Sequence, residues 1–108
     1  MTQRIKLVSG DNRPYIKLTL KDADDVPINL EGATVRVYFR ATGTDTILSV
    51  LTCQLINGGR TGQCSFNFPG TTLDVEPGPY EGEIEIDFGP ERQTVYDVLR
   101  FQVREQFN

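Results

Sequence analysis

Residues 77–88 constrain the fold of this chain more than any other segment. They read Pro-Gly-Pro-Tyr-Glu-Gly-Glu-Ile-Glu-Ile-Asp-Phe, a proline–glycine turn followed by acidic and apolar side chains in alternation. Successive side chains of a β-strand point to opposite faces of a sheet, so this pattern predicts a strand with one apolar face and one acidic face. The apolar face comprises Tyr80, Ile84, Ile86 and Phe88. The acidic face comprises Glu81, Glu83, Glu85 and Asp87.

The position of Tyr80 directly after this turn resembles the tyrosine corner of immunoglobulin-like sandwiches, whose hydroxyl bonds to the backbone upstream. Further strands are predicted wherever apolar residues alternate between turn-forming segments, over residues 4–8, 15–21, 33–41, 47–56, 61–68 and 93–105. Short strands separated by turns at such intervals are typical of a sandwich. We therefore expect an all-β fold, an immunoglobulin-like antiparallel β-sandwich of about seven strands. At 108 residues the chain forms one domain, residues 1–108.

Three of these strands, 33–41, 80–88 and 93–105, are expected to lie side by side in one sheet. Arginines of the two outer strands then flank the acidic face of the middle one, an arrangement that favours opposite charges on neighbouring strands. The simplest interpretation is a solvated face that neutralises its own charge. A face that docks a partner is the alternative.

Residues 47–56 and 61–68 are predicted to form a hairpin around a two-residue Gly58-Gly59 loop. This register places Cys53 directly across from Cys64. A disulfide between them is conceivable, because opposed Cβ atoms lie about 4.5–5.5 Å apart. Both cysteines also share a face with large apolar side chains, as small core residues do. We favour two reduced core thiols and keep a disulfide-bonded secreted domain as the alternative.

Composition excludes several function classes. The chain contains no histidine, which removes the commonest general base and metal ligand. Two cysteines are too few for a zinc site, and the acidic turn at residues 22–25 lacks the glycine and glutamate that complete a calcium loop. We therefore predict no enzyme activity, no cofactor and no metal.

Charge and hydropathy make further predictions about partners. The net charge of −4 argues against nucleic acid as a partner. No apolar stretch approaches the ~20 residues of a membrane span, and the N-terminal residues lack the apolar region of a secretory signal. Tyrosine is enriched at interfaces because it buries an apolar ring while keeping a polar tip. The outward tyrosines and their basic neighbours form a candidate interaction surface: Arg13, Tyr15, Arg36, Tyr38, Arg40, Tyr96 and Arg100.

Residues 10–35 carry a family resemblance. Gly-Asp-Asn-Arg-Pro at 10–14 precedes a strand ending in Lys-Asp-Ala-Asp at 21–24, and Pro-Ile-Asn-Leu-Glu-Gly-Ala-Thr-Val follows at 27–35. This pattern resembles the N-terminal domain of the phage baseplate upper protein and the short immunoglobulin-like phage proteins related to it. An aspartate–glycine turn usual in that pattern is replaced here by Asp24-Asp25. These motifs are structural, so they indicate a fold more firmly than a role.

The resemblance implies a non-enzymatic structural protein of a tailed-phage virion, made in the host cytoplasm. Its partners would be other virion proteins, as a capsid decoration or cement protein or as a baseplate or tail-fibre adaptor. Because a virion is built with symmetry, several copies of the protein per particle are expected, and they could assemble as a homotrimer. A carbohydrate-binding or adhesive module, in which Tyr38 and neighbouring arginines contact sugar, is the alternative from a different class.

Overall fold

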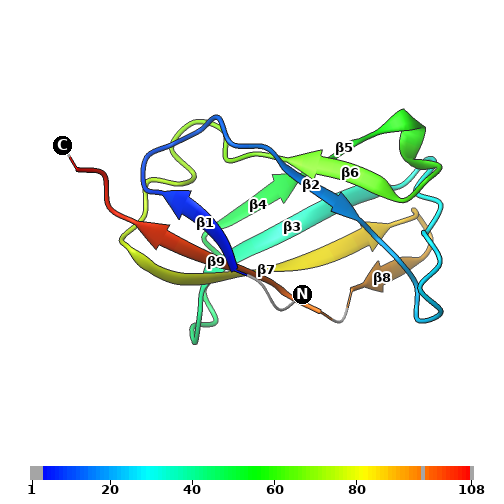
Figure 1. The fold of residues 1–108 in the computed structure, drawn as a ribbon. Helices are drawn as coiled ribbons and strands as arrows, with labels where there is room; N and C mark the ends of the chain where they lie inside the picture. Colours follow the sequence, from blue (N-terminus) through cyan, green and yellow to red (C-terminus); the bar gives the residue numbers. More distant parts are fainter. Residues whose placement is uncertain (1–3, 96, 108) are drawn as a thin grey trace.

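The computed structural model describes residues 4–95 and 97–107 (Figure 1). These residues form nine strands and a short 3-10 turn at Asn57–Gly59, with no α-helix among them. The strands are β1 (Arg4–Val8), β2 (Ile16–Thr19), β3 (Thr34–Ala41), β4 (Ser49–Thr52), β5 (Gln54–Leu55), β6 (Gln63–Phe66), β7 (Gly78–Asp87), β8 (Arg92–Thr94) and β9 (Leu99–Arg104). The predicted all-β class is confirmed.

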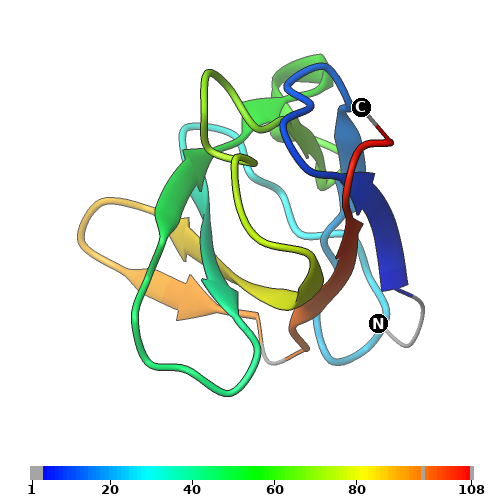
Figure 2. The same ribbon diagram turned by 90° about the vertical axis from the view of Figure 1, so that its left-hand side faces the viewer.

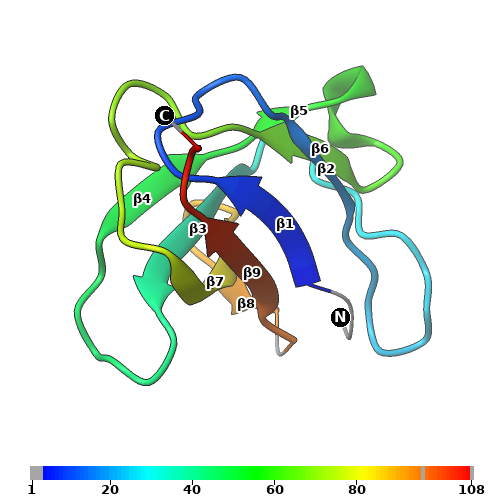
Figure 3. The same cartoon turned by 60° about the vertical axis from the view of Figure 1, so that its left-hand side comes forward.

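Two sheets form a sandwich around one core (Figures 2 and 3). The larger sheet has the order β1-β9-β7-β3-β4, with β8 also paired to β7, and the smaller has the order β2-β6-β5. The predicted neighbours 33–41, 80–88 and 93–105 are adjacent here as β3, β7 and β9. Pairing is antiparallel except at β1, which runs parallel to β9 among the described strands. The sandwich is therefore mixed rather than wholly antiparallel.

A cluster of aromatic rings fills the space between the two sheets. Phe39 on β3 lies at its centre, with its ring centroid 5.1 Å from Tyr80, 5.3 Å from Phe68 and 5.5 Å from Phe101. Phe68 and Phe101 approach Phe39 edge-on, whereas Tyr80 stacks on it. Such pairs add about 0.5–1.5 kcal/mol each beyond the burial of their area. Phe39 thus joins Tyr80 and Phe101 of the larger sheet to Phe68, which follows β6 of the smaller sheet.

Tyr80 also forms the bond that its sequence context predicts. Its hydroxyl donates to the Glu76 carbonyl at 2.5 Å, which ties the turn before β7 to the start of the strand. Burial raises the pKa of the Tyr80 hydroxyl, and the nearby Glu76 carboxylate acts in the same direction. The tyrosine therefore stays a neutral donor at physiological pH, with its ring in the core.

The predicted strand 47–56 is wrong in one respect, because the chain changes sheets at Cys53. β4 pairs with β3 in the larger sheet, whereas β5 pairs with β6 in the smaller. Leu55, and not Cys53, is the residue across from Cys64. The turn between β5 and β6 is also longer than predicted, with positive φ at Asn57 and at the two glycines that follow. Both cysteines are free and buried, as the reduced-thiol interpretation expects.

The predicted strand 93–105 is likewise two strands. β8 pairs with the second half of β7 through Glu85 and Thr94, and β9 pairs with its first half through Gly82 and Leu99. The Val95 N–H still donates to the Ile84 carbonyl, and the register shifts by two residues between this pairing and that of β9. This interruption, like the change of sheets at Cys53, raises the strand number from about seven to nine.

Candidate interaction surface

The outer face of the larger sheet carries alternating charges held by ion pairs. Arg36 on β3 lies 3.2 Å from Asp87 and 3.5 Å from Glu85, and Arg40 lies 2.7 Å from Glu81. All of these partners sit across from β3 on β7, and their side chains are half-buried. The predicted charge compensation is therefore present between β3 and β7, whereas no ion pair of the described residues joins the β9 arginines to β7.

Tyr38 lies between the two arginines on β3. Its hydroxyl donates to Glu85 Oε1 at 3.0 Å. This hydrogen bond to a carboxylate, together with partial burial, raises the pKa of the Tyr38 hydroxyl. The Asp87 pKa is lowered instead, first by a hydrogen bond from the Gly89 backbone N–H and then by the bond from Arg36. The face is thus a fixed network of charged and hydrogen-bonded groups.

A hollow of about 280 Å³ opens on this face. Its floor consists of alternate residues of two neighbouring strands, Tyr38 and Arg40 on β3 with Glu81, Glu83 and Glu85 on β7. Two apolar side chains form opposite walls: Ile47 from the β3–β4 connection and Val98 from the segment before β9. The β3–β4 connection projects beyond the sheet in the end-on view (Figure 2). We call this site the outer-face hollow.

Glu83 differs from the other carboxylates of the hollow. The β3–β7 register places it across from Tyr38, whereas Glu81 and Glu85 face Arg40 and Arg36. Its side chain is exposed, and no arginine or lysine of the described residues lies within ion-pair distance of it. The hollow therefore presents one carboxylate whose charge is not neutralised by a neighbouring cation.

Exposed apolar side chains adjoin the hollow on β4, the end strand of the larger sheet. Val50 lies across from Tyr38 and is 51% exposed, and Leu48 just before β4 is 47% exposed. Ile47, the hollow's own wall, is 44% exposed. Single exposed apolar residues are ordinary, but adjoining ones mark contact surfaces more often.

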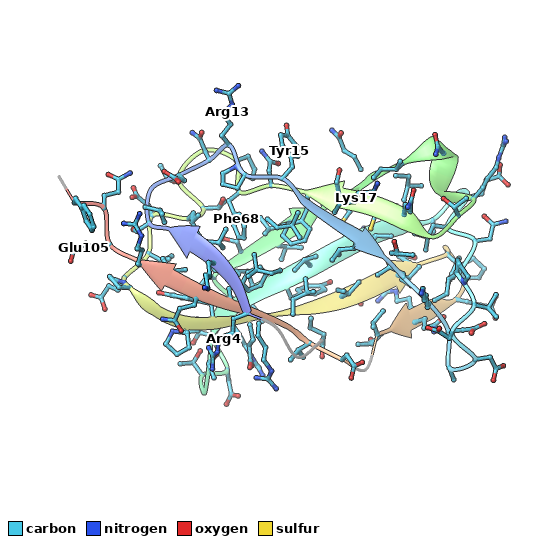
Figure 4. The ribbon with its side chains drawn as sticks, viewed as in Figure 1. Arg4, Arg13, Tyr15, Lys17, Phe68 and Glu105 are labelled. Atoms are coloured by element: carbon cyan, nitrogen blue, oxygen red, sulfur yellow. The ribbon has the colours of Figure 1, made fainter. Side chains whose placement is uncertain are left out.

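The structure divides the predicted interaction surface. Arg36, Tyr38 and Arg40 lie together on β3, and Arg100 lies exposed on β9 across from Glu81, on the same sheet face. Two other members lie apart from them: Arg13 and Tyr15 precede β2 of the smaller sheet and point outward on that side of the sandwich (Figure 4). Tyr96 lies outside the described residues.

Sequence reasoning did not single out Glu83, Ile47, Val98, Leu48 or Val50 as surface-site residues. Alternation placed Glu83 on the correct face of its strand. Its lack of an ion pair follows from the register between β3 and β7, which sets Glu83 across from Tyr38 and not from an arginine. Ile47 and Val98 belong to connections, where alternation carries no information about direction. The sequence placed Ile47 at the start of the predicted strand 47–56, so no signal marked it as part of a connection.

No further chemistry is evident in the described part of the chain. Within residues 4–95 and 97–107, no three cysteine or acidic side chains are placed to hold a metal ion. The same residues include no helix with the length and apolar character needed to cross a membrane. Their buried side-chain polar atoms all have hydrogen-bond partners.

Fold and surface together define a small β-sandwich domain with one charged, partly apolar sheet face. Among solved structures, the N-terminal domain of phage TP901-1 ORF48 has a similar fold, with a TM-score of 0.62. The similarity covers 94% of this chain and 85% of that one, at 13% sequence identity. No family model matches the sequence. No curated protein matches it either.

Proposed function

We propose that this protein is a non-enzymatic structural component of a tailed-phage virion that acts by docking onto another virion protein. The observation that carries the proposal is the fold shared with a domain of a phage protein over nearly the whole chain. The resemblance of residues 10–35 to the baseplate upper protein family rests on the sequence alone and supports the same role. Fold similarity alone is an associational argument, so the role needs a direct test.

The surface supports docking better than catalysis. Arg36 and Arg40 hold Glu81, Glu85 and Asp87 in ion pairs, so these three carboxylates already have partners within the sheet. The chain has no histidine to activate a nucleophile. Transient protein interfaces combine charged and apolar residues, as this sheet face does.

The carbohydrate-binding alternative draws less support from the geometry. It needs Tyr38 and its arginine neighbours to contact sugar hydroxyls. The guanidinium groups of Arg36 and Arg40 already bind carboxylates, and the Tyr38 hydroxyl already donates to Glu85. A glycan array on the isolated protein tests this alternative, and binding abolished by Tyr38→Ala would favour it.

Mass spectrometry of gradient-purified particles from the phage system that encodes the chain tests the virion proposal. We expect the protein in the particles at a fixed ratio to the major capsid protein. Hundreds of copies would indicate capsid decoration, and a few to a few tens would indicate a baseplate, neck or fibre adaptor. Absence from intact particles would refute the proposal.

A further inference from the structure

We propose that the outer-face hollow receives a lysine or arginine side chain of a partner protein, with Glu83 as its counter-ion. This inference rests on the proposed function, because it names the site and the chemistry of the docking partner. The hollow lies between Ile47 and Val98, and Glu83 lies in its floor. Apolar residues of the same partner would cover the exposed Leu48 and Val50 beside it.

Charge complementarity determines which side chain fits. Of the five floor residues, three are carboxylates and one is an arginine. Arg40 binds Glu81, and Arg36 beside the hollow is shared between Glu85 and Asp87. Arg100 of β9 lies across from Glu81. Glu83 is therefore the lining carboxylate with no arginine or lysine of the described residues within ion-pair distance. A basic group of the partner would complete the alternation of charge that the rest of this face already has. An acidic group would meet like charge, which is unfavourable across neighbouring strands.

The walls of the hollow suit the stem of such a side chain. Lysine and arginine lay their methylene groups along apolar surface while the charged head reaches a polar partner. Ile47 and Val98 provide apolar contact on both sides of the carboxylate. The volume of about 280 Å³ lies just below the range of about 300–1,000 Å³ that is typical of small-molecule pockets. It therefore suits one side chain better than a cofactor.

The neighbouring strand offers the apolar contact that surrounds a docked charge in protein interfaces. Exposed end strands of monomeric proteins are commonly protected by lysine, proline or other charged residues. The end strands β1 and β2 follow this rule with Lys6 and Lys17. β5, the other end strand of the smaller sheet, is uncharged but only two residues long, whereas β4 has four residues, Ser-Val-Leu-Thr, and no charge. Its outward Val50 lies directly beside Tyr38 of the hollow, so the apolar strip and the carboxylate form one continuous surface.

Charge variants in the intact phage test the inference. The phage is propagated with the wild-type gene, with Glu83→Gln, with Glu83→Lys, or with the control Glu105→Lys, and the copy number in purified particles is measured. Glu105 is exposed and lies beyond β9 at one end of the molecule (Figure 4), so its reversal changes net charge equally without touching the hollow. We expect at least a tenfold loss of incorporation for Glu83→Lys, a smaller loss for Glu83→Gln and no change for Glu105→Lys. Circular dichroism and the thermal midpoint of each purified variant establish that it folds.

A photo-cross-linking residue identifies the chemistry of the partner directly. Benzoylphenylalanine replaces Val98 at the wall of the hollow or, as a control, the exposed Val26 in the turn before β3. After irradiation of purified particles, the Val98 variant is expected to attach to a virion peptide with a lysine or arginine within a few residues of the attachment point. The Val26 variant is expected not to label that peptide.

The outcomes separate this inference from the proposed function. If the wild-type protein is in the particles while folded Glu83→Lys is incorporated equally well, the inference fails and the virion role stands. A Val98 cross-link to a peptide without a basic residue overturns it in the same way. If the wild-type protein is absent from the particles, the proposed function fails, and this inference fails with it.

Discussion

The replacement of Gly82 by alanine tests how tightly neighbouring side chains pack on the inner face of the larger sheet, at the centre of β7. Glycine within a strand is normally a weakness, because its backbone loses more entropy on folding, so alanine should stabilise by about 0.5–1 kcal/mol. Gly82 has ordinary strand geometry, so the backbone itself would accept alanine. A Cβ at this position would, however, lie 2.9 Å from Val37 Cγ1 and 3.1 Å from Phe101 Cε2.

The sign of the effect follows from these distances. Carbon atoms attract each other best at about 3.5–4.0 Å, and an extra methyl group in a packed core costs about 1–3 kcal/mol. The steric cost therefore exceeds the entropic gain. Gly82→Ala is expected to lower the free energy of unfolding by about 1 kcal/mol, which corresponds to about 4–8 °C in the thermal midpoint.

A double-mutant cycle identifies Val37 as the main obstacle. The chain lacks tryptophan, so unfolding in urea is followed by far-ultraviolet circular dichroism and tyrosine fluorescence. Val37→Ala removes the nearest atom, so Gly82→Ala should cost much less in that background, with a coupling energy of at least about 0.5 kcal/mol. If Gly82→Ala raises the stability of the wild-type protein, or costs the same in both backgrounds, the packing argument is wrong.

Three further predictions concern hydrogen bonds and titration. Tyr80→Phe keeps the ring but removes the bond to the upstream carbonyl, so urea unfolding should show a loss of about 0.5–1.5 kcal/mol; an unchanged midpoint would show that the bond contributes nothing. A bond to Cys64 and burial raise the pKa of the Cys53 thiol, and both sulfur atoms are buried, so the native protein should resist thiol reagents at pH 8 and denaturation should release two reactive thiols. No reactive thiol after denaturation would indicate a disulfide, which consumes both cysteines. The Asp87 pKa is lowered by the Gly89 N–H and then by an arginine of β3, so its stabilising effect is present above the unfolded pKa near 4 and is lost as pH falls through the folded value. The stability difference between wild type and Asp87→Asn should therefore shrink between pH 7 and pH 3, and a constant difference would contradict this assignment.

Alternation predicted the faces of the strands well and their boundaries poorly, for one physical reason. Both sheets of a sandwich face the same core, so Leu51 and Leu55 point inward whether or not the chain changes sheets between them. The shift between β8 and β9 is two residues, and a shift of two keeps every side chain on its original face. Leu99 therefore points inward as predicted, although its strand begins later than predicted. Neither the change of sheets at Cys53 nor the register shift before β9 alters the alternation of apolar residues in the sequence.

The surface site was predictable only in part for a related reason. Alternation placed Tyr38 and Glu83 on outward faces, and the structure agrees. Which of the carboxylates lacks a cation depends on the register between β3 and β7, which no local pattern determines. The hollow also needs Ile47 and Val98, whose positions follow from the course of two connections after the sheets have formed.

The parallel pairing of β1 with β9 has a consequence for how the protein is made. Residues Arg4 and Arg100 are partners in one ladder, so the first described strand has no neighbour until the last one has been synthesised. At about 5–20 residues per second, the ribosome exposes β1 for several seconds before its partner appears. During that time Leu7 and Ile5 lie in an unpaired strand whose charged neighbours, Arg4 and Lys6, keep it from pairing with other chains. The larger sheet thus gains β1 only after residues 99–104 have been synthesised and folded onto it.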